Sequence, residues 1–67
     1  MTKTEKIAQQ LNKEIDRKIE QQQILLENTE VDLEVAKKLD DQHRAKRSEK
    51  RIKNIKARIK ELEDKKE

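Results

Sequence analysis

The sequence predicts an all-α protein, and three observations carry that prediction. The chain has 67 residues and contains no Gly, no Pro and no aromatic residue, while 49% of its residues are charged and only 30% are hydrophobic. Its common residues are good helix formers, and the mixture is typical of long helices and coiled coils. The aliphatic side chains recur at steps of three and four, as on one face of a helix. Periodic aliphatic residues and charges of alternating sign also argue against a disordered chain.

We expect a first helix over about 3–39. Thr2, followed three residues later by Glu5, has the spacing of a capping box at a helix start. At about 100° per residue the apolar positions form one broad stripe along the helix, and the opposite face of the helix is charged and solvated. The stripe comprises Ile7, Ala8, Leu11, Ile15, Ile19, Gln22, Leu25, Leu26, Thr29, Leu33 and Ala36, with Leu39 at its edge.

We expect a second, basic helix over about 44–66, because isoleucines and a leucine continue there at steps of 3, 4 and 3. Propagated as one straight helix, this stripe is rotated by roughly a quarter turn from the first. A chain reversal at about 40–43 explains the break: Lys37 and Lys38 suit the end of a helix, and Asp40 and Asp41 suit the start of the next. Residues 1–67 then form one unit. This hairpin pairs Ile52 with Thr29, Ile55 with Leu26, Ile59 with Gln22 and Leu62 with Ile19.

Two alternatives stay open at this point. A turn at Asn28-Thr29 is possible, because Asn tolerates the backbone conformation that ends helices and Thr29 stands three residues before Asp32, again as in a capping box. The third arrangement has no turn and is one rod of roughly 100 Å at about 1.5 Å per residue.

All three arrangements predict self-association. The chain has 15 Ile, Leu and Val residues, which one hairpin cannot shield, so we expect a homodimer: a four-helix bundle of two hairpins or a coiled coil of two rods. The expected dimer interface consists of aliphatic residues from both helices: Ile7, Leu11, Ile15, Ile19, Leu26, Leu33, Ile52, Ile55, Ile59 and Leu62.

The positive charge is concentrated in the second half of the chain. Residues 1–33 have a net charge of −2 and residues 34–67 a net charge of +5. Between Arg44 and Lys60 there are nine basic residues and one acid, Glu49. Such a density attracts a polyanion, because neutralised phosphates release condensed counterions. The predicted binding residues, for nucleic acid or a protein partner, are Arg44, Lys46, Arg47, Lys50, Arg51, Lys53, Lys56, Arg58 and Lys60.

The composition limits the chemistry. Without aromatic side chains the protein cannot stack on unpaired bases, so direct contacts would be mainly to phosphates. The absence of cysteine excludes thiolate metal sites and disulfides. His43, three residues after Asp40, could begin a metal site on one helical face in a symmetric bundle, but a hydrated turn or interface His is the simpler interpretation. No nucleophile has a base beside it, so we expect no enzyme, no cofactor and no small-molecule substrate. Without an apolar leader or span, we expect a cytoplasmic protein with no membrane contact.

The first residues carry a short resemblance. Met1-Thr2-Lys3, Glu5-Lys6 and Ala8 resemble the start of the Rop family of small plasmid copy-number proteins, whose two-helix hairpins dimerise into a four-helix bundle. The likeness covers about eight residues, and the aromatic residue of the RNA-contacting face in that family has no counterpart here, so RNA-loop binding is not implied. In size and charge-rich helical composition the chain is also similar to small phage regulators that bind a host repressor such as LexA.

Together these observations predict a non-enzymatic, homodimeric regulator or adaptor, such as a phage or plasmid accessory protein. Its basic half would act on a nucleoprotein complex by binding either a DNA-binding protein, such as a repressor, or nucleic-acid phosphates. The alternative is a structural coiled-coil spacer or oligomerisation module without nucleic-acid contact.

Overall fold

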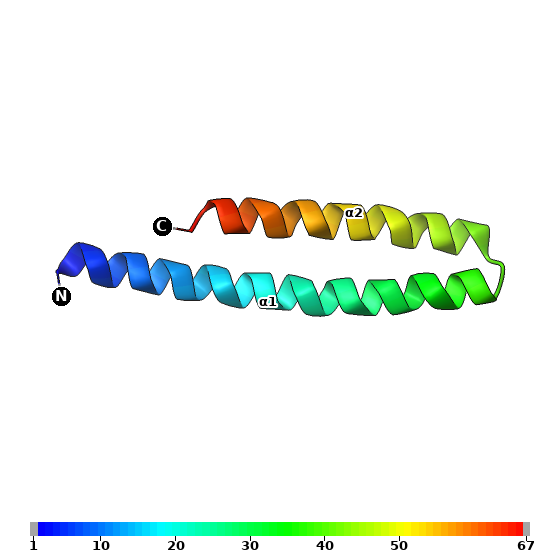
Figure 1. Ribbon diagram of the computed structural model, residues 1–67, viewed down its shortest axis with the longest axis horizontal. Coiled ribbons are helices and arrows are strands. Elements are labelled where there is room, and N and C mark those ends of the chain that lie inside the picture. The colour runs from blue at the N-terminus through cyan, green and yellow to red at the C-terminus, as the bar shows by residue number, and fades with distance from the viewer. Residues whose placement is uncertain (1, 67) are drawn as a thin grey trace.

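The computed structural model describes residues 2–66, which form an antiparallel hairpin of two helices, α1 (Lys3–Lys38) and α2 (Gln42–Asp64). The helices lie side by side along a body whose principal extents are 57 × 14 × 8 Å (Figure 1). The prediction of an all-α helical hairpin is confirmed. The alternative of one rod is wrong, since the chain reverses between Lys38 and Gln42, and the alternative of a turn at residues 28–29 is wrong, since α1 runs through these residues without a break.

The turn is built by a left-handed residue. After Lys38, Leu39 closes α1, and Asp40 has φ 55°, in the left-handed region. The amide of Asp41 then donates to the carbonyl of Ala36 at 2.9 Å, and the amide of Asp40 to that of Lys37 at 3.1 Å. These two bonds form a Schellman motif, which satisfies carbonyls that a helix end leaves free. The second helix consequently begins at Gln42 rather than near 44, and it ends at Asp64 rather than near 66.

Both helices begin with a side-chain cap. The Thr2 hydroxyl accepts a hydrogen bond from the amide of Glu5 at 3.2 Å, at the spacing expected from the sequence. The Asp41 carboxylate accepts one from the amide of Arg44 at 3.1 Å. Each bond satisfies an amide that has no partner within its helix. The two adjacent aspartates therefore divide the turn between them, since Asp40 reverses the chain and Asp41 starts α2.

The helices meet along one seam, whose residues alternate at steps of three and four in both helices, as in a coiled coil. In α1 the seam is Ile15, Ile19, Gln22, Leu26, Thr29, Leu33 and Ala36; in α2 it is Ala45, Ser48, Ile52, Ile55, Ile59 and Leu62. All of these side chains are buried or half-buried. Near the turn the seam is lined by small residues, and Ala36 is completely buried, which allows the two backbones to approach closely.

The core is small. Only Ile15, Ile19, Ala36 and Ile55 are buried apolar residues within the described range, and no large side chain there is completely buried. Thr29 is buried as well, and its hydroxyl donates to the carbonyl of Leu25 in its own helix at 2.7 Å. That bond explains how a polar residue is tolerated in the seam without ending α1.

Two polar contacts between the helices agree with the expected register. Near the turn, the Ser48 hydroxyl donates to Asp32 at 3.0 Å. At the far end, Lys66 forms an ion pair with Asp16. Each of these contacts is displaced by one residue from the predicted alignment, and the two displacements are in opposite directions. The predicted alignment of Ile55 with Leu26, which lies between the two contacts along the hairpin, is therefore consistent with both.

The N-terminal part of α1 extends beyond α2. The α2 helix ends at Asp64, and Lys66 just after it lies at the level of Asp16, so the first three turns of α1 have no helix beside them (Figure 1). Ile7 and Leu11 in this segment are exposed, as expected for residues that project past the second helix. Five further aliphatic side chains are also exposed: Ile24, Leu25, Val31, Val35 and Leu39. Leu25 thus lies outside the seam, although the sequence pattern predicts it in the main stripe.

Candidate nucleic-acid interface

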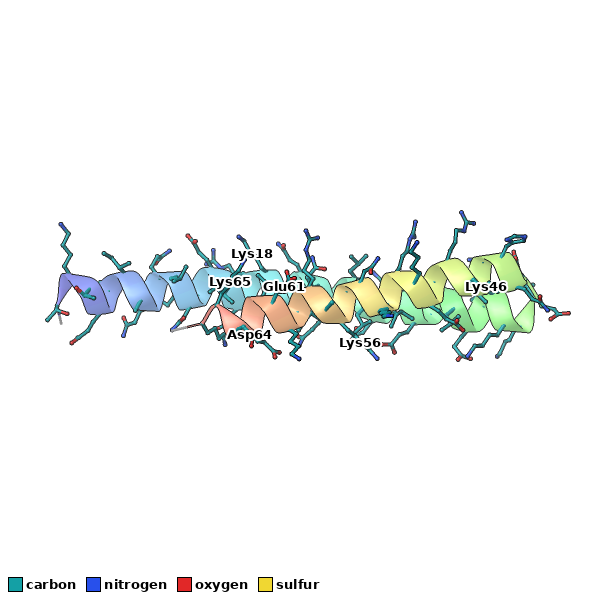
Figure 2. The ribbon with its side chains drawn as sticks, turned by 90° about the horizontal axis from the view of Figure 1, so that it is seen from above. Lys18, Lys46, Lys56, Glu61, Asp64 and Lys65 are labelled. Carbon is teal, nitrogen blue, oxygen red and sulfur yellow. The ribbon has the colours of Figure 1, made fainter. Side chains whose placement is uncertain are left out.

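The basic residues of α2 are divided by type between the two long sides of the helix. Residues seven apart lie on one line of a coiled-coil helix. Arg44, Arg51 and Arg58 follow one edge of the seam with Arg47 beside them, and we name these four residues the arginine side. Lys46, Lys53, Lys56 and Lys60 follow the opposite edge, and we name them the lysine side. Figure 2 shows Lys56 on one long edge of the hairpin and Lys18 of α1 on the other.

A cluster on the arginine side is organised by Asp32 of α1. Arg44 forms an ion pair and hydrogen bond with one carboxylate oxygen of Asp32, and the Ser48 hydroxyl donates to the other oxygen at 3.0 Å. Ser48 is 3% exposed and lies in the seam, so Asp32 is held at the junction of the helices. A hollow of about 130 Å³ opens there. Its lining consists of Asp32, Arg44, Arg47, Ser48 and Arg51.

The electrostatics of the cluster leave an excess of positive charge. The hydrogen bond from Arg44 holds the pKa of the Asp32 carboxyl below its usual range, and the Ser48 hydroxyl and the charge of Arg51 act in the same direction. The pKa of Arg44 is raised by the same contact. Asp32 therefore stays ionised and neutralises one guanidinium. Within the described residues no acid forms an ion pair with Arg47 or Arg51, which leaves both available to an anionic ligand.

The arginines suit a phosphate ligand for a geometric reason. A guanidinium is planar, always charged and able to donate two parallel hydrogen bonds to phosphate or carboxylate oxygens. Arg47 and Arg51 are one turn apart on α2, and both are exposed. Arg44 is held by Asp32 at the edge of the same hollow. Two free guanidiniums and a fixed third one form a surface that can grip neighbouring oxygens of a polyanion.

All nine basic residues predicted as binding residues lie on α2, but α2 does not present them as one patch. Arg44, Arg47, Arg51 and Arg58 share one side, while Lys46, Lys53, Lys56 and Lys60 share the other and Lys50 lies between them, away from α1. A straight duplex that lies along one side of α2 thus contacts about half of the set. Asp32 and Ser48 were not foreseen as part of the site, because their contact joins residues 16 apart in sequence.

The residues predicted as the dimer interface have different environments within one chain. Ile15, Ile19 and Ile55 are already buried in the hairpin seam. Leu26, Leu33, Ile52, Ile59 and Leu62 are half-buried there. Ile7 and Leu11 are exposed on the projecting part of α1. Their role between two chains stays a prediction. Three exposed aliphatic residues that are not part of the predicted interface, Ile24, Val31 and Val35, form a further apolar surface.

The suggestion that Asp40 and His43 share a helical face is wrong. Asp40 lies in the turn with φ 55°, before α2 begins at Gln42, so its carboxylate does not follow the helical spacing to His43. Across residues 2–66 there is no group of three His, Cys, Asp or Glu side chains that could hold a metal ion. Neither of the described helices is apolar enough over a sufficient length to cross a bilayer.

Comparison with known proteins finds no matching family model, no matching curated protein and no matching solved structure.

Proposed function

We propose that this protein is a small non-enzymatic regulator that acts as a homodimer on nucleoprotein complexes and binds nucleic-acid phosphates through the arginine side of α2. The observation that carries the proposal is the cluster around Asp32. In it Arg44 is fixed, while Arg47 and Arg51 lie beside it without acidic partners.

The spacing of the arginines supports contact with a phosphate backbone. Arg44, Arg51 and Arg58 are seven residues apart, which is about 10.5 Å along a helix. Arg47 lies between the first two. The row thus extends along the helix axis over about 21 Å, which is long enough to contact several phosphates in succession. The protein offers no aromatic side chain for base stacking, so such contacts carry affinity with little sequence preference.

Titration of duplex DNA and duplex RNA with the protein over a series of salt concentrations tests this proposal. We expect binding whose logarithmic affinity falls linearly with the logarithm of salt concentration. The double variant Arg47→Glu, Arg51→Glu should weaken binding at least tenfold and reduce the salt slope by about 1.8, because each lost phosphate contact removes about 0.9.

A matched control separates local contact from net charge. Lys3→Glu with Lys6→Glu changes the charge by the same amount at exposed positions of the projecting segment of α1. It should weaken binding no more than about twofold at moderate salt, because long-range charge effects are screened over about 8 Å at physiological ionic strength. Equal losses in the two double variants would contradict a specific role for the arginine side.

A second control compares the two sides of α2. Lys46→Glu with Lys53→Glu removes charge from the lysine side and leaves the arginine cluster intact. If this variant loses more affinity than the arginine variant, the contact lies on the other side of the helix. If the unmodified protein binds neither duplex at low salt, phosphate binding is refuted, and the acidic surface of a DNA-binding protein becomes the partner to test.

A further inference from the structure

Three exposed aliphatic side chains of α1 form, with Asn28, a second heptad line on the side of the helix that faces away from α2. Ile24, Asn28, Val31 and Val35 follow one another at steps of 4, 3 and 4, the spacing of a coiled-coil seam. Ile24 and Val31 each lie two residues beyond a seam residue, which is a rotation of about 200°. Leu25 and Leu39 flank the line, and Val31 is 63% exposed. We name Ile24, Asn28, Val31 and Val35 the outer line.

The two flanks of the outer line differ in charge. Along one flank Glu20, Glu27 and Glu34 follow at steps of seven. Glu27 and Glu34, together with Glu30 and Lys38, line a shallow groove around Val31 and Val35. The opposite flank carries Leu25, Asp32 and Leu39. Asp32 on this flank is bonded to Arg44 and lies close to Arg51, so the surface beyond it is basic.

We propose that the outer line is the homodimer interface, and that the α1 helices of two copies pair there in parallel. This deepens the proposed function, which requires a homodimer, by naming the surface and the orientation. A two-fold axis parallel to α1 places the glutamate flank of each copy against the flank of the other that carries Leu25, Asp32 and Leu39, with Arg44 and Arg51 of α2 beyond it. An antiparallel pair instead places the glutamates of both copies on the same flank, where Glu27 and Glu34 repel one another.

Asn28 gives a second reason for the parallel orientation. In a parallel pair each residue of this line lies beside the same residue of the other copy, so two Asn28 amides can hydrogen-bond across the axis. In an antiparallel pair that aligns Ile24 with Val35, Asn28 lies against Val31 and its amide loses that partner. A single polar residue of this kind in an apolar line specifies register and orientation.

The outer line is also the surface best suited to a second copy of this chain. The exposed large aliphatic residues of the described chain all lie before α2, on α1 or at its last turn. Face-to-face packing of two hairpins, as in a four-helix bundle, would press the charged sides of α2 against the partner. Pairing through α1 alone keeps both copies of α2 on the outside of the dimer.

Disulfide trapping tests the orientation directly, because the chain contains no cysteine. Gln21 and Val35 lie on the outer line or its continuation, two heptads apart, which is about 21 Å. In a parallel dimer Gln21→Cys and Val35→Cys should each form a disulfide with the same residue of a second copy. An antiparallel dimer allows at most one of these and favours a mixed disulfide between the two variants. Ala57→Cys, on α2 away from α1, is the control for random collision.

Sedimentation of the full chain tests the surface itself. The double variant Val31→Lys, Val35→Lys should raise the dimer dissociation constant at least 100-fold, while the control Ala57→Lys leaves it unchanged. Asn28→Val should tighten the dimer but lose its single orientation, so that the mixed disulfide between positions 21 and 35 appears. Helicity of each variant, measured by circular dichroism at high concentration, shows whether the hairpin still forms.

The outcomes of these experiments distinguish a failure of the proposed dimer interface from a failure of the proposed phosphate binding. Three results would each overturn the parallel interface. The protein could stay monomeric at 100 μM, or the dimer could be unaffected by the lysine variant. The third is a mixed disulfide between Gln21→Cys and Val35→Cys in chains that keep Asn28. None of these measurements contains nucleic acid. Loss of phosphate binding in the titration leaves the interface standing, and an overturned interface leaves the phosphate contact of α2 to be judged from its own titration.

Discussion

Replacing Ile55 with alanine should remove a large part of the stability of the hairpin. Ile55 is 7% exposed and is the only buried isoleucine of α2. The change deletes three carbon groups, and at about 0.8 kcal/mol for each the lost transfer free energy is about 2.4 kcal/mol. The cavity left behind adds to this, and measured Ile→Ala changes in cores cost about 2–5 kcal/mol. We therefore expect a loss of about 3 kcal/mol.

The assay is urea unfolding followed by circular dichroism, since the protein has no aromatic residue for fluorescence. Ile7→Ala is the matched control, because Ile7 is 61% exposed on the projecting segment of α1. The same chemical change there should cost less than about 1 kcal/mol. Each variant is measured at two protein concentrations, since dimerisation makes the unfolding midpoint depend on concentration and a change that weakens the dimer alters this dependence.

Comparable losses at the two positions would refute the assignment of Ile55 to a core inside one chain. A loss below about 1 kcal/mol for Ile55→Ala would have the same meaning, because a buried isoleucine in a core this small has few neighbours that can collapse into the space.

Three further changes test the turn and the Asp32 contacts. Asp40→Gly should raise the free energy of unfolding by about 0.5–1 kcal/mol, measured in urea, because glycine adopts a positive φ without a steric penalty; Asp40→Ala should not stabilise the protein. Ser48→Ala should cost about 0.5–1.5 kcal/mol, the usual net value of one hydrogen bond, and a neutral result would show that Ser48 does not hold Asp32. The lowered pKa of Asp32 means that its contribution to stability is complete above the pKa of the unfolded chain and is lost as the pH falls through the folded-state pKa, below about 4. The difference in thermal midpoint between the protein and Asp32→Asn should therefore shrink on acidification, and a difference that stays constant from pH 7 to pH 2 would contradict the ion pair.

The hairpin could be predicted from local signals. The break in phase between the two stripes requires a reversal, and Asp40-Asp41 is the segment that supports one. The predicted start of α2 near residue 44 is too late, because the sequence does not show that Asp40 alone completes the reversal and leaves Asp41 free to cap. The hydrogen bond from the backbone amide of Asp41 to the carbonyl of Ala36 fixes this detail, and it depends on no side-chain pattern.

It is harder to predict from the sequence which residues of the broad apolar stripe of α1 belong to the seam with α2. Steps of four, as from Ile7 through Leu11 to Ile15, rotate by about 40° each on a straight helix, so such a series drifts away from a seam that repeats every 3.5 residues. Ile15 lies in the seam, whereas Ile7 and Leu11 lie progressively to its side. The Asp32 cluster could not be predicted at all, since an acid, a serine and an arginine at these positions are each ordinary residues of a solvated helix.

The division of α2 into a guanidinium row and an ammonium row means that the two sides of this helix differ in chemical reactivity. Acetylation converts ammonium groups to neutral amides and does not react with guanidiniums. Full acetylation would thus strip the charge from one border of this helix while Arg44, Arg47, Arg51 and Arg58 keep theirs. A polyanion that still binds the protein after full acetylation must therefore be bound by the arginine side of α2.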